Sequence, residues 1–164
     1  IDYVIDFATY AIIPAYFIYE APLLPEEVKL LGAAIILLIS AIYYGLDGMV
    51  SSDYYFIGFP VMWNMVAFYL FFVLNLPEWI NFTLIFFFAV LHFIPIKFLY
   101  PRRTVKFRWL NLAASALFLI SNIWIIAIYD DKNTILSCLS IGSVGFFAWM
   151  AIYSTWIDED TKGI

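Results

Sequence analysis

The chain has 164 residues, of which 65% are hydrophobic and only 13% are charged, and its formal net charge is −5. Soluble domains carry about a quarter charged residues, so this composition excludes a soluble protein and indicates that lipid is the solvent. The acidic residues lie in connecting segments and tails, and no basic tract suggests a nucleic acid as partner. We therefore predict an all-α integral membrane protein with a single transmembrane domain over residues 1–164.

Charged and proline-containing connections divide the sequence into about six apolar segments, most of them close to the ~20 residues that cross ~30 Å of hydrocarbon. The predicted transmembrane helices run from about Ile1 to Tyr19, Leu30 to Leu46, Val61 to Leu76, Trp79 to Ile96, Trp109 to Tyr129 and Thr134 to Ile157. The third segment is short for a span. Adjacent bulky residues, as at 86–88, do not alternate with a period of two, so barrel strands are not predicted.

The distribution of Lys and Arg predicts the orientation of these helices. Five of the eight basic residues lie between positions 97 and 108, which predicts that this connection is cytoplasmic. Alternation then places the 47–60 connection and the C-terminal tail on the same face, and the connections at 20–29, 75–79 and 130–133 on the other. Asp2 and Asp6 consequently fall at the cytoplasmic end of the first helix.

These two aspartates are the first candidates for a functional site. They are four positions apart in the chain, so they lie on one helix face, one turn from each other. Two carboxylates so close repel unless a cation or a proton lies between them, and hard divalent cations prefer carboxylate oxygens. One carboxylate could also act as a general base. On spacing alone, a helix end whose acids meet water explains the pair equally well.

Three stretches of the sequence resemble one family of lipid-synthesising enzymes. They are IDYVIDFATYAIIPA at 1–15, GFPVMWNMVAFYLF at 58–71 and FIPIKFLYPRR at 93–103. Their order and spacing are similar to those of bacterial phosphatidylcholine synthases, which belong to the CDP-alcohol phosphatidyltransferases. That family carries the signature D-x2-D-G-x2-A-R, a spacer and G-x3-D-x3-D, and Asp2-x3-Asp6 matches its last two aspartates. The resemblance covers most of residues 1–108.

This resemblance implies a fold, a reaction and a metal. The fold would have about eight spans, with two spans and the rest of the signature upstream of Ile1, so we expect the natural N-terminus to be missing. The reaction would join CDP-diacylglycerol and choline into phosphatidylcholine and CMP, with Mn²⁺ or Mg²⁺ as cofactor. Asp2 would be a metal ligand, and Asp6 the base and a further ligand. The enzyme would lie in the bacterial inner membrane with its site facing the cytoplasm, and a homodimer stays open.

Choline carries a quaternary ammonium, which proteins hold against aromatic faces. The cytoplasmic candidates are Tyr43, Tyr44, Tyr54, Tyr55, Phe56, Phe59 and Trp63. Trp63 and Asn64 rank highest because they lie in a family-like stretch, Tyr54 and Tyr55 follow, and Asp53 offers a counter-charge. The alternative is an ordinary interfacial belt of aromatic residues, which marks many membrane proteins.

Arg102 and Arg103 directly follow the family-like FIPIKFLYP and are candidates for binding the phosphates of the CDP-lipid. The alternative is a basic connection that only sets topology and meets anionic headgroups.

Other functions stay open on the sequence. Within the family, the acceptor could instead be serine, inositol or glycerol phosphate. A small transporter is a different class, but ion-coupled carriers place carboxylates near the midplane, and here His92 is the one titratable residue predicted deep within a span. A purely structural subunit would not need paired aspartates.

Overall fold

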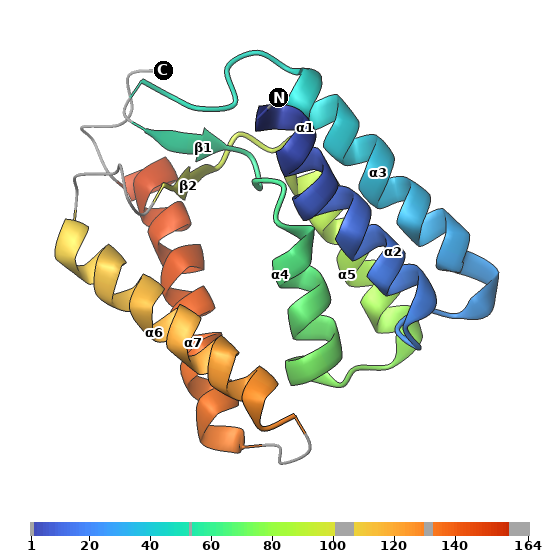
Figure 1. Cartoon of the computed structure of the whole chain (residues 1–164). Helices are drawn as coiled ribbons and strands as arrows, with labels where there is room; N and C mark the ends of the chain where they lie inside the picture. Colours follow the sequence, from blue (N-terminus) through green and yellow to red (C-terminus); the bar gives the residue numbers. More distant parts are fainter. Residues whose placement is uncertain (1, 53, 101–106, 130–132, 158–164) are drawn as a thin grey trace. The chain divides into compact units, whose positions relative to one another are not determined.

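The computed structural model describes residues 2–52, 54–100, 107–129 and 133–157 (Figure 1). Contacts divide the chain into two compact units. The first consists of Ile1–Met49 and Gly58–Ile94, and the second of Val50–Ile57 and Pro95–Ile164. A single transmembrane domain over the whole chain stays a prediction.

The first unit begins with one continuous helical run, in which α1 (Asp2–Phe7), a π-helical turn (Ala8–Ile12) and α2 (Ile13–Glu20) follow without a break. Pro14 lies at the start of α2 and has no amide to donate to the carbonyl four residues earlier. The π-helical turn lies just before Pro14. Prolines and π turns are both typical sites at which the regular backbone hydrogen bonds of a helix are interrupted.

The remaining helices of the first unit are a 3₁₀ turn (Glu26–Val28), α3 (Lys29–Gly45), α4 (Trp63–Phe68) with a π-helical extension (Tyr69–Leu74), and α5 (Glu78–Leu91). The α1–α2 run lies antiparallel to α3, since the ring of Tyr3 meets Tyr44 while Leu24 packs at Gly32 near the start of α3. The start of α5 is held to the α2–α3 connection by buried Asn81, whose Nδ2 donates to the O of Leu23 at 2.9 Å.

The second unit combines a small sheet with two long helices. Strands β1 (Tyr55–Ile57) and β2 (Lys97–Leu99) pair antiparallel, with Tyr55 opposite Leu99. Helix α6 (Arg108–Ala127) packs on α7 (Thr134–Ile152), which continues as a π-helical turn (Tyr153–Ile157). The Asn133 side chain caps the start of α7 by accepting from the backbone amides of residues 135 and 136.

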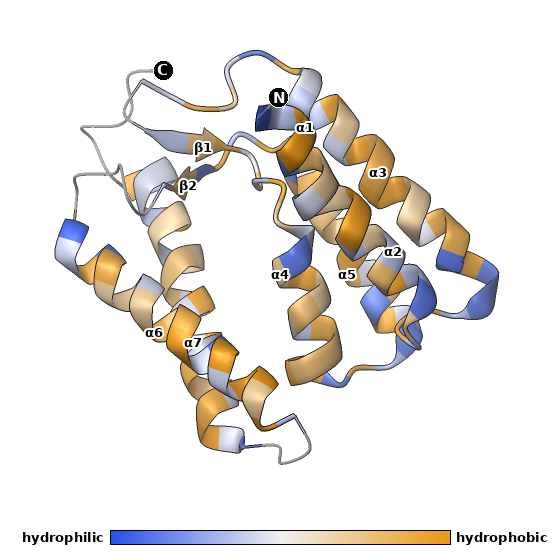
Figure 2. Cartoon of the chain, in the orientation of Figure 1, coloured by the Kyte–Doolittle hydropathy of each residue, from blue (hydrophilic) through white to orange (hydrophobic). Residues whose placement is uncertain are grey.

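The predicted all-α membrane fold is confirmed. Three helical segments are long and apolar enough to cross a membrane: Glu26–Gly45, Arg108–Ala127 and Thr134–Ile157. Trp63–Leu74 and Glu78–Leu91 are shorter apolar helices, and with the α1–α2 run they complete the six helical segments of the described residues. Hydrophobic residues cover these helices while hydrophilic ones gather at the connections, as between α2 and α3 (Figure 2).

Two features of the connections differ from the sequence prediction. Helix α5 ends at Leu91, several residues before the predicted Ile96, and the Leu91 carbonyl accepts from the amide of Phe59 at 3.1 Å. The residues that follow form β2, which pairs with β1 from the 47–60 connection. Paired strands lie side by side, so residues 55–57 and 97–99 are neighbours. The predicted cytoplasmic face of the two connections stays a prediction.

Candidate functional site

The two predicted aspartates lie on α1, in the first and second turns of the α1–α2 run. Asp2 is exposed and Asp6 is half-buried, and the 3.6-residue period puts them on the same face. The helix therefore presents two carboxylates on one side, as the spacing predicted.

Aromatic side chains from α1 and α3 meet near Asp6 in the first unit. Its carboxylate lies near enough to Tyr44, in the last turn of α3, for the two groups to interact electrostatically. The Tyr44 ring meets Tyr3 with centroids 6.1 Å apart and Phe7 with centroids 6.3 Å apart. We call Tyr3, Phe7 and Tyr44 the α1–α3 aromatic cluster. The sequence analysis included Tyr44 among its aromatic candidates but did not single out Tyr3 or Phe7.

The carboxylates can supply only part of a metal site. Within the described ranges, no group of three or more His, Cys, Asp or Glu side chains comes together. Asp2 and Asp6 nevertheless offer, on one face of α1, the hard oxygen atoms that Mg²⁺ and Mn²⁺ prefer. The donor chemistry fits such an ion, provided that further ligands come from outside these two residues.

Behind this end of α3 lies a buried polar and aromatic cluster centred on His92. The imidazole stacks on Trp63 with centroids 5.3 Å apart and an interplanar angle of 15°. Trp63 Nε1 donates to the Oγ of Ser40 at 2.9 Å, and the ring of Tyr43 meets His92 edge-on. We call Ser40, Tyr43, Phe59, Trp63 and His92 the His92 cluster, because the ring of Phe59 also contacts the imidazole.

The His92 side chain has one unusual atom. Its Nδ1 lies 2.7 Å from the O of Phe88 and must donate there, because a carbonyl only accepts, which leaves Nε2 as an acceptor. Nε2 is buried and has no hydrogen-bond partner in the part of the chain that the structure describes. His92 lies directly after α5 and not deep within the span where the sequence analysis placed it.

The residues predicted to hold choline do not gather in one unit. Trp63 and Asn64 begin α4 in the first unit, where Trp63 is fully buried and Asn64 is exposed. Tyr54 and Tyr55 belong to the second unit, where Tyr54 is 47% exposed and Tyr55 is 2% exposed. Asp53, in the 47–60 connection, lies outside the described residues.

Both buried rings already have partners within the protein. Tyr55 packs with Leu99 and Met150, and the ammonium of Lys97 lies 5.9 Å from its ring centroid. Trp63 is stacked on His92, as described above. Tyr54, with a φ of 63°, is the exposed ring of the predicted set. The choline role of all these residues stays a prediction.

The predicted phosphate ligands Arg102 and Arg103 lie outside the described residues. Lys97, just before them, is described: it is buried in β2, and its backbone amide donates to Thr155 Oγ1 at 2.9 Å. Its ammonium lies over the ring of Tyr55 and is therefore not directed to solvent.

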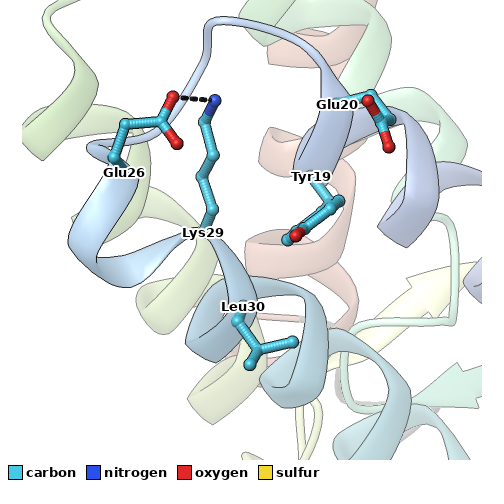
Figure 3. A pocket seen from close by; sticks show the side chains of 5 residues that line it. All are labelled: Tyr19, Glu20, Glu26, Lys29 and Leu30. Carbon is cyan, nitrogen blue, oxygen red and sulfur yellow. Dashed lines mark hydrogen bonds and ion pairs between the residues drawn. The ribbon is translucent and has the colours of Figure 1, made fainter.

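A surface pocket of about 310 Å³ lies at the opposite end of α2 and α3 from Asp6 (Figure 3). Tyr19, Glu20, Glu26, Lys29 and Leu30 line it. Lys29 forms an ion pair with Glu26, so one of the two acidic side chains that line the pocket is already neutralised. The pocket is thus separated by the length of α3 from the aspartate pair.

Comparison with known proteins identifies the family. The chain is 42% identical to phosphatidylcholine synthase of Mesorhizobium japonicum over 117 residues, 38% identical to that of Pseudomonas aeruginosa over 153 residues, and 32% identical to that of Legionella pneumophila over 163 residues. The chain belongs to the phosphatidylcholine synthase family. The matches cover 71%, 93% and 95% of the chain, so in the last two they extend past residue 108, where the sequence resemblance had faded.

The chain spans only part of the curated phosphatidylcholine synthases that it matches: 43% of the length of the first relative and 64% of each of the other two. No protein-family model matches the chain. No solved structure matches it either.

Proposed function

We propose that the full-length protein transfers the phosphatidyl group of CDP-diacylglycerol to choline, forming phosphatidylcholine and CMP. The observation that carries this proposal is the Asp2–Asp6 pair, which shares one face of α1 and is exposed to half-buried, in a chain of this family. Ionisable residues at a membrane helix end are functional candidates by default.

Asp6 is proposed as the base. The choline hydroxyl gives its proton to the Asp6 carboxylate while its oxygen attacks the phosphorus that carries the diacylglycerol. A new P–O bond to choline forms, the P–O bond to CMP breaks, and CMP leaves with the bonding electrons. Asp6 is half-buried and not enclosed, which leaves it accessible to an acceptor.

Asp2 and Asp6 are proposed to hold a divalent cation together with ligands from outside the described residues. Bound Mn²⁺ or Mg²⁺ would neutralise the pyrophosphate and favour the departure of CMP. Asp2, the more exposed of the pair, would serve only as a ligand. Arg102 and Arg103 are proposed to bind phosphate oxygens, and Asp53 to offer a counter-charge near the acceptor.

The acceptor test separates this proposal from other members of the wider family. Purified full-length protein with CDP-diacylglycerol and Mg²⁺ or Mn²⁺ should release CMP with choline, and chelation by EDTA should stop the release. Serine, inositol and glycerol phosphate serve as competing acceptors in parallel assays. If one of these supports CMP release and choline does not, the choline assignment is wrong although the transferase class stands.

The site is proposed to face the cytoplasm of a bacterial inner membrane. The support is the basic 97–108 connection and its pairing, through β2, with the connection that contains β1. Cys138 is the single cysteine, so Cys138→Ser gives a background for labelling. In this cysteine-free background, Asp131→Cys should react with an impermeant maleimide in spheroplasts. Thr104→Cys should react only after the membrane is permeabilised. The reverse labelling pattern would place the aspartates outside.

A further inference from the structure

The chemistry of choline limits where its ammonium can lie. Only two carbons separate the hydroxyl oxygen from the quaternary nitrogen, so the group that holds the nitrogen must neighbour the base that takes the hydroxyl proton. This argument rests on the proposed function, in which Asp6 is that base. Since a quaternary ammonium has no N–H to donate, aromatic faces are its main partners in proteins.

The α1–α3 aromatic cluster meets this requirement. On α1, Asp2 and Asp6 lie on one side of the helix. Tyr3 and Phe7, which are also four positions apart, lie together on the side about 100° further round. Tyr44 of α3 links this helix end to α3, because its ring contacts both α1 rings and its hydroxyl group lies within electrostatic range of Asp6. The three rings therefore form one cluster, and it lies at the same end of the α1–α3 pair as the Asp6 carboxylate.

The rings of this cluster are open to a ligand. Tyr3 is 72% exposed, and Phe7 and Tyr44 are half-buried. Interplanar angles of 59° between Tyr3 and Tyr44 and of 78° between Phe7 and Tyr44 turn the ring faces in different directions. Tilted faces can enclose one cation from several sides, whereas parallel stacked rings cover one another.

The aromatic residues of the earlier set are less suited to this role. Trp63 is fully buried and stacked on His92, and the ring of Tyr55 has the ammonium of Lys97 over it. A cation from the protein thus occupies the position that choline would need on Tyr55. Tyr54 is exposed and belongs to the second unit, whereas Asp6 belongs to the first.

The His92 cluster fixes the end of α3 that carries Tyr44. Tyr43 is buried against His92, and Tyr43 and Tyr44 meet edge-on with centroids 6.4 Å apart. Ser40, one turn earlier, accepts the indole N–H of Trp63. These contacts hold the last turn of α3 in place before any ligand arrives, and a rigid site loses less entropy on binding.

We propose that Tyr3, Phe7 and Tyr44 form the subsite that holds the quaternary ammonium of choline beside Asp6, and that this subsite sets the preference for choline over acceptors without such a group. Trp63 then acts as a positioning residue in the core behind it.

The test measures choline kinetics of full-length Tyr44→Leu and Tyr3→Leu variants. Each should raise the KM for choline, by roughly thirty-fold for a desolvated contact and by several-fold for an exposed one. The KM for CDP-diacylglycerol and the kcat should change little, because binding is lost equally in the ground and transition states. Tyr44→Phe keeps the ring and should restore the wild-type KM.

Two further measurements isolate the subsite. Tetramethylammonium carries the cation without a hydroxyl, so it should inhibit competitively with choline, and Tyr44→Leu should weaken that inhibition. Tyr16→Leu, at a 66% exposed tyrosine of α2, is the matched control and should leave the KM for choline unchanged.

The outcomes distinguish this proposal from the function on which it rests. Unchanged choline KM in Tyr3→Leu and Tyr44→Leu, or a fall in kcat at constant KM, would overturn the subsite while leaving choline transfer intact. Wild-type protein that forms no phosphatidylcholine from choline would overturn the proposed function itself. A rise in KM confined to the cluster variants supports the subsite.

Discussion

Asp6→Asn in the full-length protein should lower the rate of phosphatidyl transfer to choline by about 10²–10⁴, the range typical for loss of a general base. The amide keeps the size of the side chain but cannot accept the hydroxyl proton. The measurement is CMP release at saturating choline and CDP-diacylglycerol. Asp6 is half-buried on a helix that stays intact, so the variant should still enter the membrane and fold.

Asp2→Asn separates the metal role from the base role. Because Asp2 is proposed only as a ligand, its loss should weaken the response to Mg²⁺ or Mn²⁺, and higher metal concentrations should recover part of the rate. No metal concentration should recover Asp6→Asn. The matched control is Glu20→Gln, which removes one exposed carboxylate at the opposite end of the same helical run. Near-normal transfer by Asp6→Asn would rule out the base assignment.

The paired aspartates illustrate what a sequence can predict about this site. A spacing of four residues in a helix determines that two side chains share a face, whatever the tertiary contacts are. The apolar runs predict helices just as directly, because a helix is the simplest way to satisfy the hydrogen bonds of every backbone amide in lipid. For these reasons the helical membrane fold and the α1 carboxylates were both predictable from the residues alone.

The aromatic residues show where prediction from the sequence ends. Whether a ring is a ligand site or a core depends on what the neighbouring helices place against it. Trp63 looked like a binding residue because of its family-like stretch, yet Ser40 and His92 enclose it. Tyr3 and Phe7 were not singled out in the sequence, and only the structure places Tyr44, 41 and 37 positions away, beside them.

The small sheet of β1 and β2 could not be predicted from the sequence either. Each strand is three residues long, too short for a pattern with a period of two to stand out. Its pairing joins connections that are about 40 residues apart, and only the charge argument for a shared face hinted that they could meet. The end of α5 depends likewise on a backbone contact from Phe59, a residue of the preceding connection.

Gly58→Ala should be the most destabilising single substitution of a small residue in the first unit. Gly58 has a φ of +80°, and an added Cβ would collide with the backbone carbonyl oxygen of His92 and lie 2.8 Å from its carbonyl carbon. Strain at such a φ costs of order 1–3 kcal/mol, and forced displacement of packed groups typically adds 1–3 kcal/mol. We expect a loss of about 2–6 kcal/mol in the free energy of unfolding, measured by thermal unfolding in detergent.

Two glycines of the same unit separate the causes. Gly48 has a similar φ of +82° but no atom within 4 Å of an added Cβ, so Gly48→Ala reports the backbone strain alone. Gly45 has neither feature, and Gly45→Ala should be close to neutral. Because the carbonyl of His92 cannot move without α5, the Gly58 variant should also disturb the stack between His92 and Trp63, seen as a change in tryptophan fluorescence. If Gly58→Ala proves no less stable than Gly48→Ala, then the close approach of residue 58 to the end of α5 does not stabilise the fold, and the His92 cluster must hold α3 in place without it.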